Sequence, residues 1–295
     1  MSSAPSSAPP RLWAIALALT SVYVLWGSTY LGIRYALEGY PPFLLGAIRM
    51  TLAGALMYGF LRWRGVPAPT RGQWKRLWWL SIFMVLLSNG LVNVAEQEVS
   101  SGMAAVAVAS MPLWAALFAF LRGERPRRNE WLGLAVGFVG VLWLNAGTDL
   151  AATPTGMIAL LIAPVAWAWG SIWSRGRDLP MPFMSAAGQM LTGGVWMFAA
   201  AVATGERMTE LPPLSATLAV GYLITFGSII GFTAYIWLLH HVRPALATSY
   251  AYVNPPIAVL FGVLLASETF TRHELAAMGV ILAGVAIITL SRTKR

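Results

Sequence analysis

Arg49 is the one charged residue well inside an apolar run, about seven residues or 10 Å from the start of that run. A guanidinium group binds a carboxylate through two parallel hydrogen bonds, so Arg49 is a candidate anchor for the carboxylate of an amino acid. The alternatives are a structural ion pair or a side chain that reaches to the surface of a membrane. The acidic residues considered for such a pair are Glu38, Glu96 and Glu98.

Two polar stripes occur at helical spacing. Asn89 and Asn93 are four residues apart and Glu96 follows three residues later, so a helix places them on or near one face. Tyr250 and Asn254 share a face by the same rule. Because polar side chains are disfavoured against lipid, both stripes should either line a cavity or form hydrogen bonds to neighbouring helices.

Aromatic and sulfur side chains add an apolar component to this candidate site. Trp26 and Trp169 lie in the middle of apolar runs, each followed by Gly and Ser. They could form an aromatic wall for hydrophobic or cationic substrates, or their small neighbours could serve close helix packing. Methionines could make such a pocket adaptable or simply fill the core. The methionines concerned are Met103, Met111, Met184 and Met190.

Composition indicates what surrounds these side chains. Of the 295 residues, 58% are apolar and 11% charged, whereas a soluble domain needs more charge on its surface. Apolar runs of about twenty residues recur, the length that crosses a hydrocarbon core of about 30 Å. The net charge of +9 could suggest a nucleic-acid partner, but the basic residues lie in short loops between apolar runs. We therefore expect the lipid bilayer as partner and no nucleic acid.

The apolar runs predict an all-α integral membrane protein with ten transmembrane helices. Segment 1–12 begins with a Ser/Pro-rich stretch that predicts disorder, and the run after it is too long for a signal peptide. The polar, Pro and Trp-Gly-Ser features fall in spans 1, 3, 4, 6 and 9, which should enclose a central cavity. The expected spans are 13–33, 42–62, 77–95, 102–121, 130–147, 155–174, 183–204, 217–239, 244–267 and 272–291.

Positive charge predicts the orientation of these helices. Loops 2–3, 4–5, 6–7 and 8–9, together with both termini, hold sixteen Lys and Arg residues. The opposite side holds three, which are Arg34, Arg207 and Arg272. Because cytoplasmic loops are enriched in Lys and Arg, both termini should be cytoplasmic.

The sequence also contains an internal repeat, with units at 13–147 and 155–291. The Trp26-Gly27-Ser28 motif recurs at 169–171, Arg49 corresponds to Gln189, and segment 112–144 matches 256–288 at eight positions. Chance matching of apolar helices would not supply the matched charges and prolines. Five spans per unit is an odd number, so the second unit should be inverted relative to the first, as in many transporters that work by alternating access.

These motifs resemble the drug/metabolite transporter superfamily, in the form of two EamA-type domains covering nearly the whole chain. The resemblance extends to the YedA- and YddG-like bacterial permeases, and it implies ten helices, a central cavity and export of amino acids or related metabolites. The first span has no acidic residue, unlike small multidrug antiporters, and spans 9 and 10 have no Lys, unlike nucleotide-sugar carriers. The motifs are Trp26-Gly27-Ser28-Thr29, Pro112…Glu124…Glu130…Gly140-Val141 with its second copy, Pro244 to Pro255, and Glu96.

The expected function is therefore transport of amino acids or related metabolites, including aromatic ones, across a bacterial inner membrane by a monomer. No Gly-rich loop of the nucleotide-binding type is present, so transport should be passive or ion-coupled. With no acidic residue expected deep inside a span, a proton carrier is not evident. Efflux of organic-cation drugs or other metabolites by proton antiport is the alternative.

An intramembrane enzyme is the rival of another class. It would need a nucleophile, an acid–base pair or a metal cluster at membrane depth, and no His–acid pair or carboxylate dyad lies deep inside the expected spans. The chain has no Cys and three His, so disulfides and thiolate metal sites are excluded. We expect no catalytic residue, no cofactor and no metal. The substrate-binding candidates are Trp26, Arg49, Asn89, Asn93, Met111, Trp169, Gln189, Tyr250 and Asn254.

Overall fold

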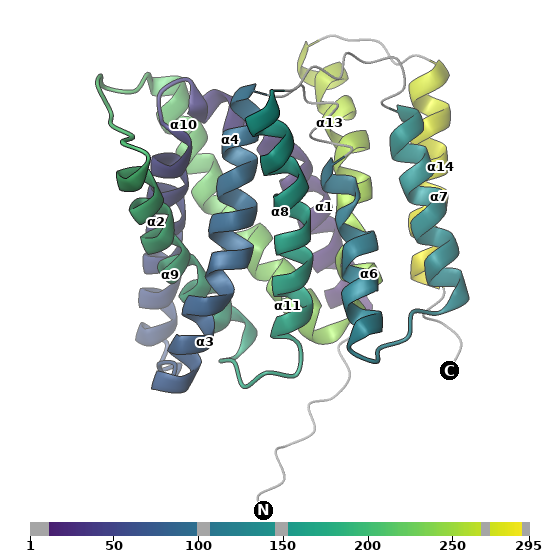
Figure 1. Ribbon diagram of the computed structural model, residues 1–295, viewed down its shortest axis with the longest axis horizontal. Coiled ribbons are helices and arrows are strands. Elements are labelled where there is room, and N and C mark those ends of the chain that lie inside the picture. Colours follow the sequence, from purple (N-terminus) through teal and green to yellow (C-terminus); the bar gives the residue numbers. More distant parts are fainter. Residues whose placement is uncertain (1–11, 99–106, 145–152, 267–271, 291–295) are drawn as a thin grey trace, which may run out of the picture.

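The computed structural model describes residues 12–98, 107–144, 153–266 and 272–290, which form helices and short connections without any strand. Figure 1 shows these helices side by side in one bundle between an upper and a lower face. The all-α prediction is confirmed for this part of the chain. Of the segment expected to be disordered, residues 1–11 lie outside the described residues, and Leu12 already begins a helix.

The helices of the first repeat start and end close to the breaks expected from Pro, Gly and charge. Helices α3 and α4 form one continuous helix, because the π-helical stretch between them, written η1, joins them without a break. The elements are α1 (Leu12–Leu37), α2 (Pro42–Trp63), α3 (Arg71–Ser81), η1 (Ile82–Gly90), α4 (Leu91–Glu98), α6 (Met111–Leu121) and α7 (Arg128–Leu144).

The described elements of the second repeat follow the same order, with the short helix α12 in addition. A second π-helical stretch, η2, lies between α10 and α11, at the position in the repeat that corresponds to η1. The elements are α8 (Pro154–Ser174), α9 (Pro182–Ala203), α10 (Leu214–Tyr222), η2 (Leu223–Phe232), α11 (Thr233–His241), α12 (Pro244–Ala247), α13 (Tyr250–Ala266) and α14 (Arg272–Leu290).

Among the described residues, six helices are long and apolar enough to cross a membrane. They correspond to the expected spans 1, 2, 3, 6, 7 and 8, and two shorter apolar helices, Ala107–Leu121 and Leu275–Ile288, accompany them. An integral membrane fold is therefore supported by length and hydropathy together. The six helices are Leu12–Leu37, Pro42–Trp63, Arg71–Gln97, Pro154–Ser174, Pro182–Ala203 and Leu214–His241.

Helices α2 and α9 have the same start and stop signals. Pro42 and Pro182 occupy the first turn of their helices, where the missing N–H has no helical partner to lose. Gly65 and Gly205 follow the two helices with φ of 80° and 73°, the left-handed conformation that a side chain disfavours. The repeat therefore fixes where equivalent helices begin and end.

Equivalent helices of the two repeats pack against each other through glycines. A Cβ atom on Gly54 of α2 would lie 2.7 Å from the backbone nitrogen of Leu191 in α9, and one on Gly194 of α9 would lie 2.9 Å from that of Thr51 in α2. Gly54 corresponds to Gly194 and Thr51 to Leu191, so the contacts are unchanged when the two helices are exchanged. Since the residue numbers increase along one helix as they decrease along the other, α2 and α9 are antiparallel.

Helices α7 and α14 repeat this arrangement. A Cβ atom on Gly140 would lie 2.9 Å from the backbone nitrogen of Ile281, and one on Gly284 would lie 2.7 Å from the Cα atom of Gly137. These contacts are again related by the repeat and again antiparallel. The described helices therefore support the inverted arrangement of the two units, because equivalent helices run in opposite directions.

The basic loops gather on the lower face of Figure 1, where α1 also begins and α14 ends. Arg76 in the middle of α3 pairs with Asp178 after α8 at 2.8 Å. Arg175, after α8, donates hydrogen bonds to the carbonyl oxygens of Leu239 and Val242 and lies 3.4 Å from Glu124. These contacts link α3 and three connections at one end of the bundle, and all three connections are predicted to be cytoplasmic. They are the connections α6–α7, α8–α9 and α11–α12.

On the opposite face, a contact joins the two repeats. The carboxylate of Glu206, after α9, accepts hydrogen bonds from the backbone N–H groups of Phe43 at 3.1 Å and Leu44 at 2.8 Å. These groups belong to the first turn of α2 and have no partner within the helix, so Glu206 caps α2 and its charge complements the helix dipole.

Candidate substrate-binding cavity

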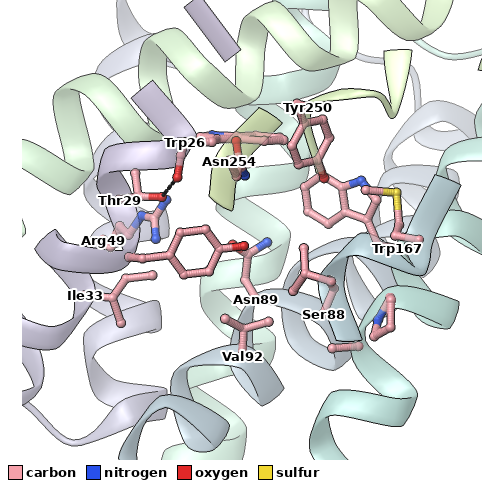
Figure 2. A pocket seen from close by; sticks show the side chains of 15 residues that line it. Trp26, Thr29, Ile33, Arg49, Ser88, Asn89, Val92, Trp167, Tyr250 and Asn254 are labelled. Carbon is pink, nitrogen blue, oxygen red and sulfur yellow. Dashed lines mark hydrogen bonds between the residues drawn. The ribbon is translucent and has the colours of Figure 1, made fainter. Parts of the chain in front are cut away.

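A cavity of about 90 Å³ lies between helices of both repeats (Figure 2). Its walls come from α1, α4 with η1, the helix around Met111, α8 and α13, with one side chain from α2. The prediction that spans 1, 3, 4, 6 and 9 enclose a cavity is thereby confirmed, and span 2 is added through Arg49. The lining residues are Trp26, Thr29, Tyr30, Ile33, Arg49, Ser88, Asn89, Val92, Val108, Met111, Ala163, Pro164, Trp167, Tyr250 and Asn254.

Arg49 lines this cavity and is 5% exposed. Its Nε donates a hydrogen bond of 2.8 Å to the hydroxyl of Ser228 in η2. A Cβ atom on Gly227 would lie 2.9 Å from Nη2 of Arg49, so a glycine at this position leaves room for the guanidinium group. Among the described residues, the ion pairs are those of Arg76, Arg175 and Arg243, and none includes Arg49.

Glu96 corrects one expectation from the sequence. We expected it in the break after span 3, with no acidic residue inside a span, but the helix continues to Glu98 and the span includes Glu96. The apolar composition weakens after Ala95, yet the backbone hydrogen bonds do not stop there. Oε1 of Glu96 is buried without a hydrogen-bond partner, and the carboxylate interacts electrostatically with Arg49. Of the other acidic residues considered for Arg49, Glu38 is exposed, and the side chain of Glu98 lies outside the described residues.

Tyr250 and Asn254 both line the cavity, as their spacing predicted. Tyr250 is buried among aromatic rings, and Asn254 lies against the hydroxyl of Tyr30 from α1. Oδ1 of Asn254 has no hydrogen-bond partner. A buried amide oxygen without a partner is costly, so this atom is available to a donor on a bound molecule.

The stripe of Asn89 and Asn93 is divided between two environments. Asn89 lines the cavity and donates a hydrogen bond of 2.8 Å to the carbonyl of Met84 within η1. Asn93 is buried away from the cavity and donates one of 3.0 Å to the carbonyl of Pro42. The wider turn of η1 changes the angle per residue, so the four-residue rule no longer places both side chains toward one space.

Aromatic rings form part of the cavity wall. The Trp26 ring lies 5.4 Å from Trp167, 5.2 Å from Tyr235 and 4.6 Å from Tyr250, centroid to centroid. The Nε1 atom of Trp26 donates a hydrogen bond of 2.9 Å to the carbonyl of Gly227 in η2. Figure 2 shows Trp26, Trp167 and Tyr250 around the same space. This arrangement fits an apolar or aromatic part of a substrate.

Trp169 does not lie in this cluster, although the repeat relates it to Trp26. It is 39% exposed and packs edge-on against Phe118, with the ring centroids 5.4 Å apart. Residues two apart on a helix point in nearly opposite directions, about 200° apart, so Trp167 and Trp169 cannot face the same cavity. The structure therefore places Trp167 in the wall.

The remaining candidates are also separated by the fold. Met111 lines the cavity at the start of α6. Gln189 is fully buried on α9 outside the lining, where its Nε2 donates a hydrogen bond of 3.1 Å to Ser185. Met184 and Met190 are core residues, and Met103 lies outside the described residues.

Sequence reasoning did not identify Tyr30, Ser88, Pro164 and Trp167 as lining residues. Tyr30 follows the Trp-Gly-Ser-Thr motif directly and lies four residues after Trp26, so helical spacing could have found it. Pro164 lies inside α8, where a proline interrupts the backbone hydrogen bonds, which is a signal that was available. Among the described residues, no group of three or more His, Asp or Glu is arranged to hold a metal ion.

Long apolar helices in two related units, with a partly polar cavity between them, define an integral membrane protein of the transporter class. The sequence profile of the EamA-like transporter family matches residues 12–146 and 154–290, so the chain belongs to this family of the drug/metabolite transporter superfamily.

Relatives support the same assignment. The inner membrane transporter YedA of Escherichia coli strain K12 is 44% identical over 276 residues, which cover 93% of this chain and 90% of YedA. The transporter YdfC of Bacillus subtilis strain 168 is 26% identical over 273 residues, or 92% of this chain and 89% of YdfC. A solved crystal structure superposes with a TM-score of 0.79 at 23% identity, covering 97% of this chain and 100% of that one, and shows the fold alone.

Proposed function

We propose that this chain is a bacterial inner-membrane exporter of amino acids or related small metabolites that works by alternating access without ATP. Membership of a transporter family supports transport, and the 44% identity to an inner membrane transporter supports the location. The cavity between two antiparallel repeats supports alternating access, because such repeats can exchange conformations around a fixed central site.

The proposal includes ten membrane passes with both termini in the cytoplasm. Six helices satisfy the length and hydropathy of a span, and the shorter helices at 107–121 and 275–288 belong to two further passes. Helices α7 and α13 account for the remaining two. The beginning of α1 and the end of α14 lie on one face, which requires an even number of passes. That face carries the basic loops, so the positive-inside rule assigns it to the cytoplasm.

The proposed substrate class rests on the surroundings of Arg49. A guanidinium group has five N–H donors, and the Nε donor is used by the neutral Ser228. No carboxylate of the described residues forms an ion pair with Arg49. A buried cation at a cavity wall that forms no ion pair with the protein favours a substrate that brings its own carboxylate.

Efflux of organic cations by proton antiport is the second candidate. The cluster of Trp26, Trp167 and Tyr250 could bind a cation over its ring faces, and Glu96 supplies an acidic residue within a span. The charge of Arg49 in the same cavity opposes this function, because it would repel the cation.

The test is transport by the purified protein in liposomes, using a panel of labelled amino acids and organic cations with and without a pH gradient. We expect saturable uptake of one or more amino acids, reduced by competing carboxylates. Uptake restricted to cations, and driven by the pH gradient, would instead support the second candidate. A carrier that transports none of the amino acids would contradict the proposed substrate class.

A further inference from the structure

Glu96 belongs to the helix that contributes Ser88, Asn89 and Val92 to the cavity wall; it is not itself among the lining residues and has no assigned role in the proposed function. It follows Val92 by four residues on α4, so the two side chains lie on one face of the helix, and Val92 lines the cavity. Oε1 of Glu96 is buried and has no hydrogen-bond partner. An acceptor of this kind is costly to bury, so Oε1 is available to a donor on a bound molecule.

The nearest opposite charge is held apart from Glu96. Arg49 and Glu96 interact electrostatically, but no Glu96 oxygen lies within the 4.0 Å of an ion pair with Arg49. Tyr30 of α1 is the other titratable side chain that interacts with Glu96, and α8, which packs against α4, carries no titratable residue. The guanidinium group of Arg49 lines the cavity, and the carboxyl group of Glu96 lies on the Val92 face of α4, without an ion pair between them.

We propose that Glu96 is a specificity-determining residue that binds the ammonium group of a zwitterionic amino acid while Arg49 binds its carboxylate. The inference rests on the proposed function and narrows it, because a carboxylate alone would satisfy Arg49 but not Glu96. In an α-amino acid, both charged groups are attached to one carbon, so a single molecule can bridge two opposite charges a short distance apart. Each contact is then a charge-assisted hydrogen bond.

The first experiment uses the protein without any mutation. Competition against labelled L-phenylalanine is measured on the purified carrier in detergent, with 3-phenylpropionate, which lacks the ammonium group, and 2-phenylethylamine, which lacks the carboxylate. Alanine, propionate and ethylamine form a second set for a smaller side chain. We expect either deletion to weaken binding by about 10- to 150-fold, the value of one lost charge-assisted hydrogen bond.

The second experiment uses the Glu96→Gln variant, which keeps the shape of the side chain and removes its charge. It should weaken amino-acid binding by about 10- to 150-fold and leave binding of 3-phenylpropionate unchanged. Arg49→Gln should weaken binding of both. Glu96→Asp should recover part of the loss, and Glu38→Gln, which changes an exposed carboxylate outside the cavity, should have no effect.

Three results would overturn the inference. One is equal affinity of the unmodified protein for phenylalanine and 3-phenylpropionate, which remains decisive even if Glu96→Gln does not fold. Another is an equal loss for both ligands in Glu96→Gln, which indicates a structural role. The third is no loss for either ligand in that variant. Failure of the unmodified protein to bind any carboxylate would contradict the proposed function itself, and with it the inference.

Discussion

The guanidinium Nε of Arg49 in α2 donates a hydrogen bond of 2.8 Å to the hydroxyl of Ser228 in η2, across the boundary between the two repeats. This contact orients a buried cation that forms no ion pair with a carboxylate among the described residues. The orientation depends on η2, because the π-helical stretch brings both Ser228 and the small Gly227 against the guanidinium group.

Arg49→Gln should weaken binding of amino acids by about 10- to 150-fold, since it removes a charge-assisted hydrogen bond worth about 1.5–3 kcal/mol. Arg49→Lys should recover part of the affinity, because an ammonium keeps the charge but cannot form two parallel bonds. Affinity is measured by competition binding, with thermal unfolding in detergent as the control for folding. Unchanged binding would exclude a substrate contact, and loss of the protein from the membrane would indicate a structural role.

Gly54→Ala should destabilise the protein by about 1–3 kcal/mol, because the added methyl group would lie 2.7 Å from the backbone of α9 and force the helices apart. Gly59→Ala, five residues further along the same helix, is the matched control. A Cβ atom there meets nothing within 4 Å, so this change should stabilise α2 by about 0.5–1 kcal/mol. Thermal unfolding of both variants measures whether the two changes in stability have opposite signs. Equal changes would contradict the close packing of α2 against α9.

Much of the fold could be predicted from the sequence because the physical signals are local. The apolar runs have the length of a membrane span, and Pro42, Pro182 and the glycines at helix ends fix where α2 and α9 start and stop. Arg49, Tyr250 and Asn254 face the cavity, because polar groups are expensive against lipid and helical spacing then gives the face. These arguments need only one helix at a time.

The errors came from features that depend on how helices pack. No sequence signal distinguishes the π-helical stretch η1 from an ordinary apolar helix. This stretch directs the side chains of Asn89 and Asn93 into different environments. The repeat pointed to Trp169, but the direction of α8 relative to its neighbours selects Trp167. Composition alone places Glu96 in a loop, because it does not show that backbone hydrogen bonding continues to Glu98.

Arg243→Gln should lower the stability more than Arg76→Gln does, although each removes one ion pair between connections on the same face. The carboxylate of Glu130 is 3% exposed and also accepts a hydrogen bond of 2.7 Å from the N–H of Arg127, so losing Arg243 leaves a buried charge undercompensated. We expect a cost of about 1.5–3 kcal/mol. The Arg76–Asp178 pair is 37% and 66% exposed, so its loss should cost less than about 1 kcal/mol. Thermal unfolding compares the two variants, and equal shifts would contradict the difference in burial.

Reporter fusions should show that the two faces of the bundle lie on opposite sides of the inner membrane. A fluorescent protein fused at Arg295 should fold in the cytoplasm, and alkaline phosphatase fused there should be inactive. Phosphatase inserted at Gly205, between α9 and α10, should be active, whereas the same insertion at Gly123, between α6 and α7, should not. The loops that join α2 to α3 and α6 to α7 hold an excess of Lys and Arg. Loops of this kind resist translocation and therefore stay in the cytoplasm. Phosphatase activity at Arg295 would overturn the orientation, and activity at both glycines would overturn the inverted arrangement of the repeats.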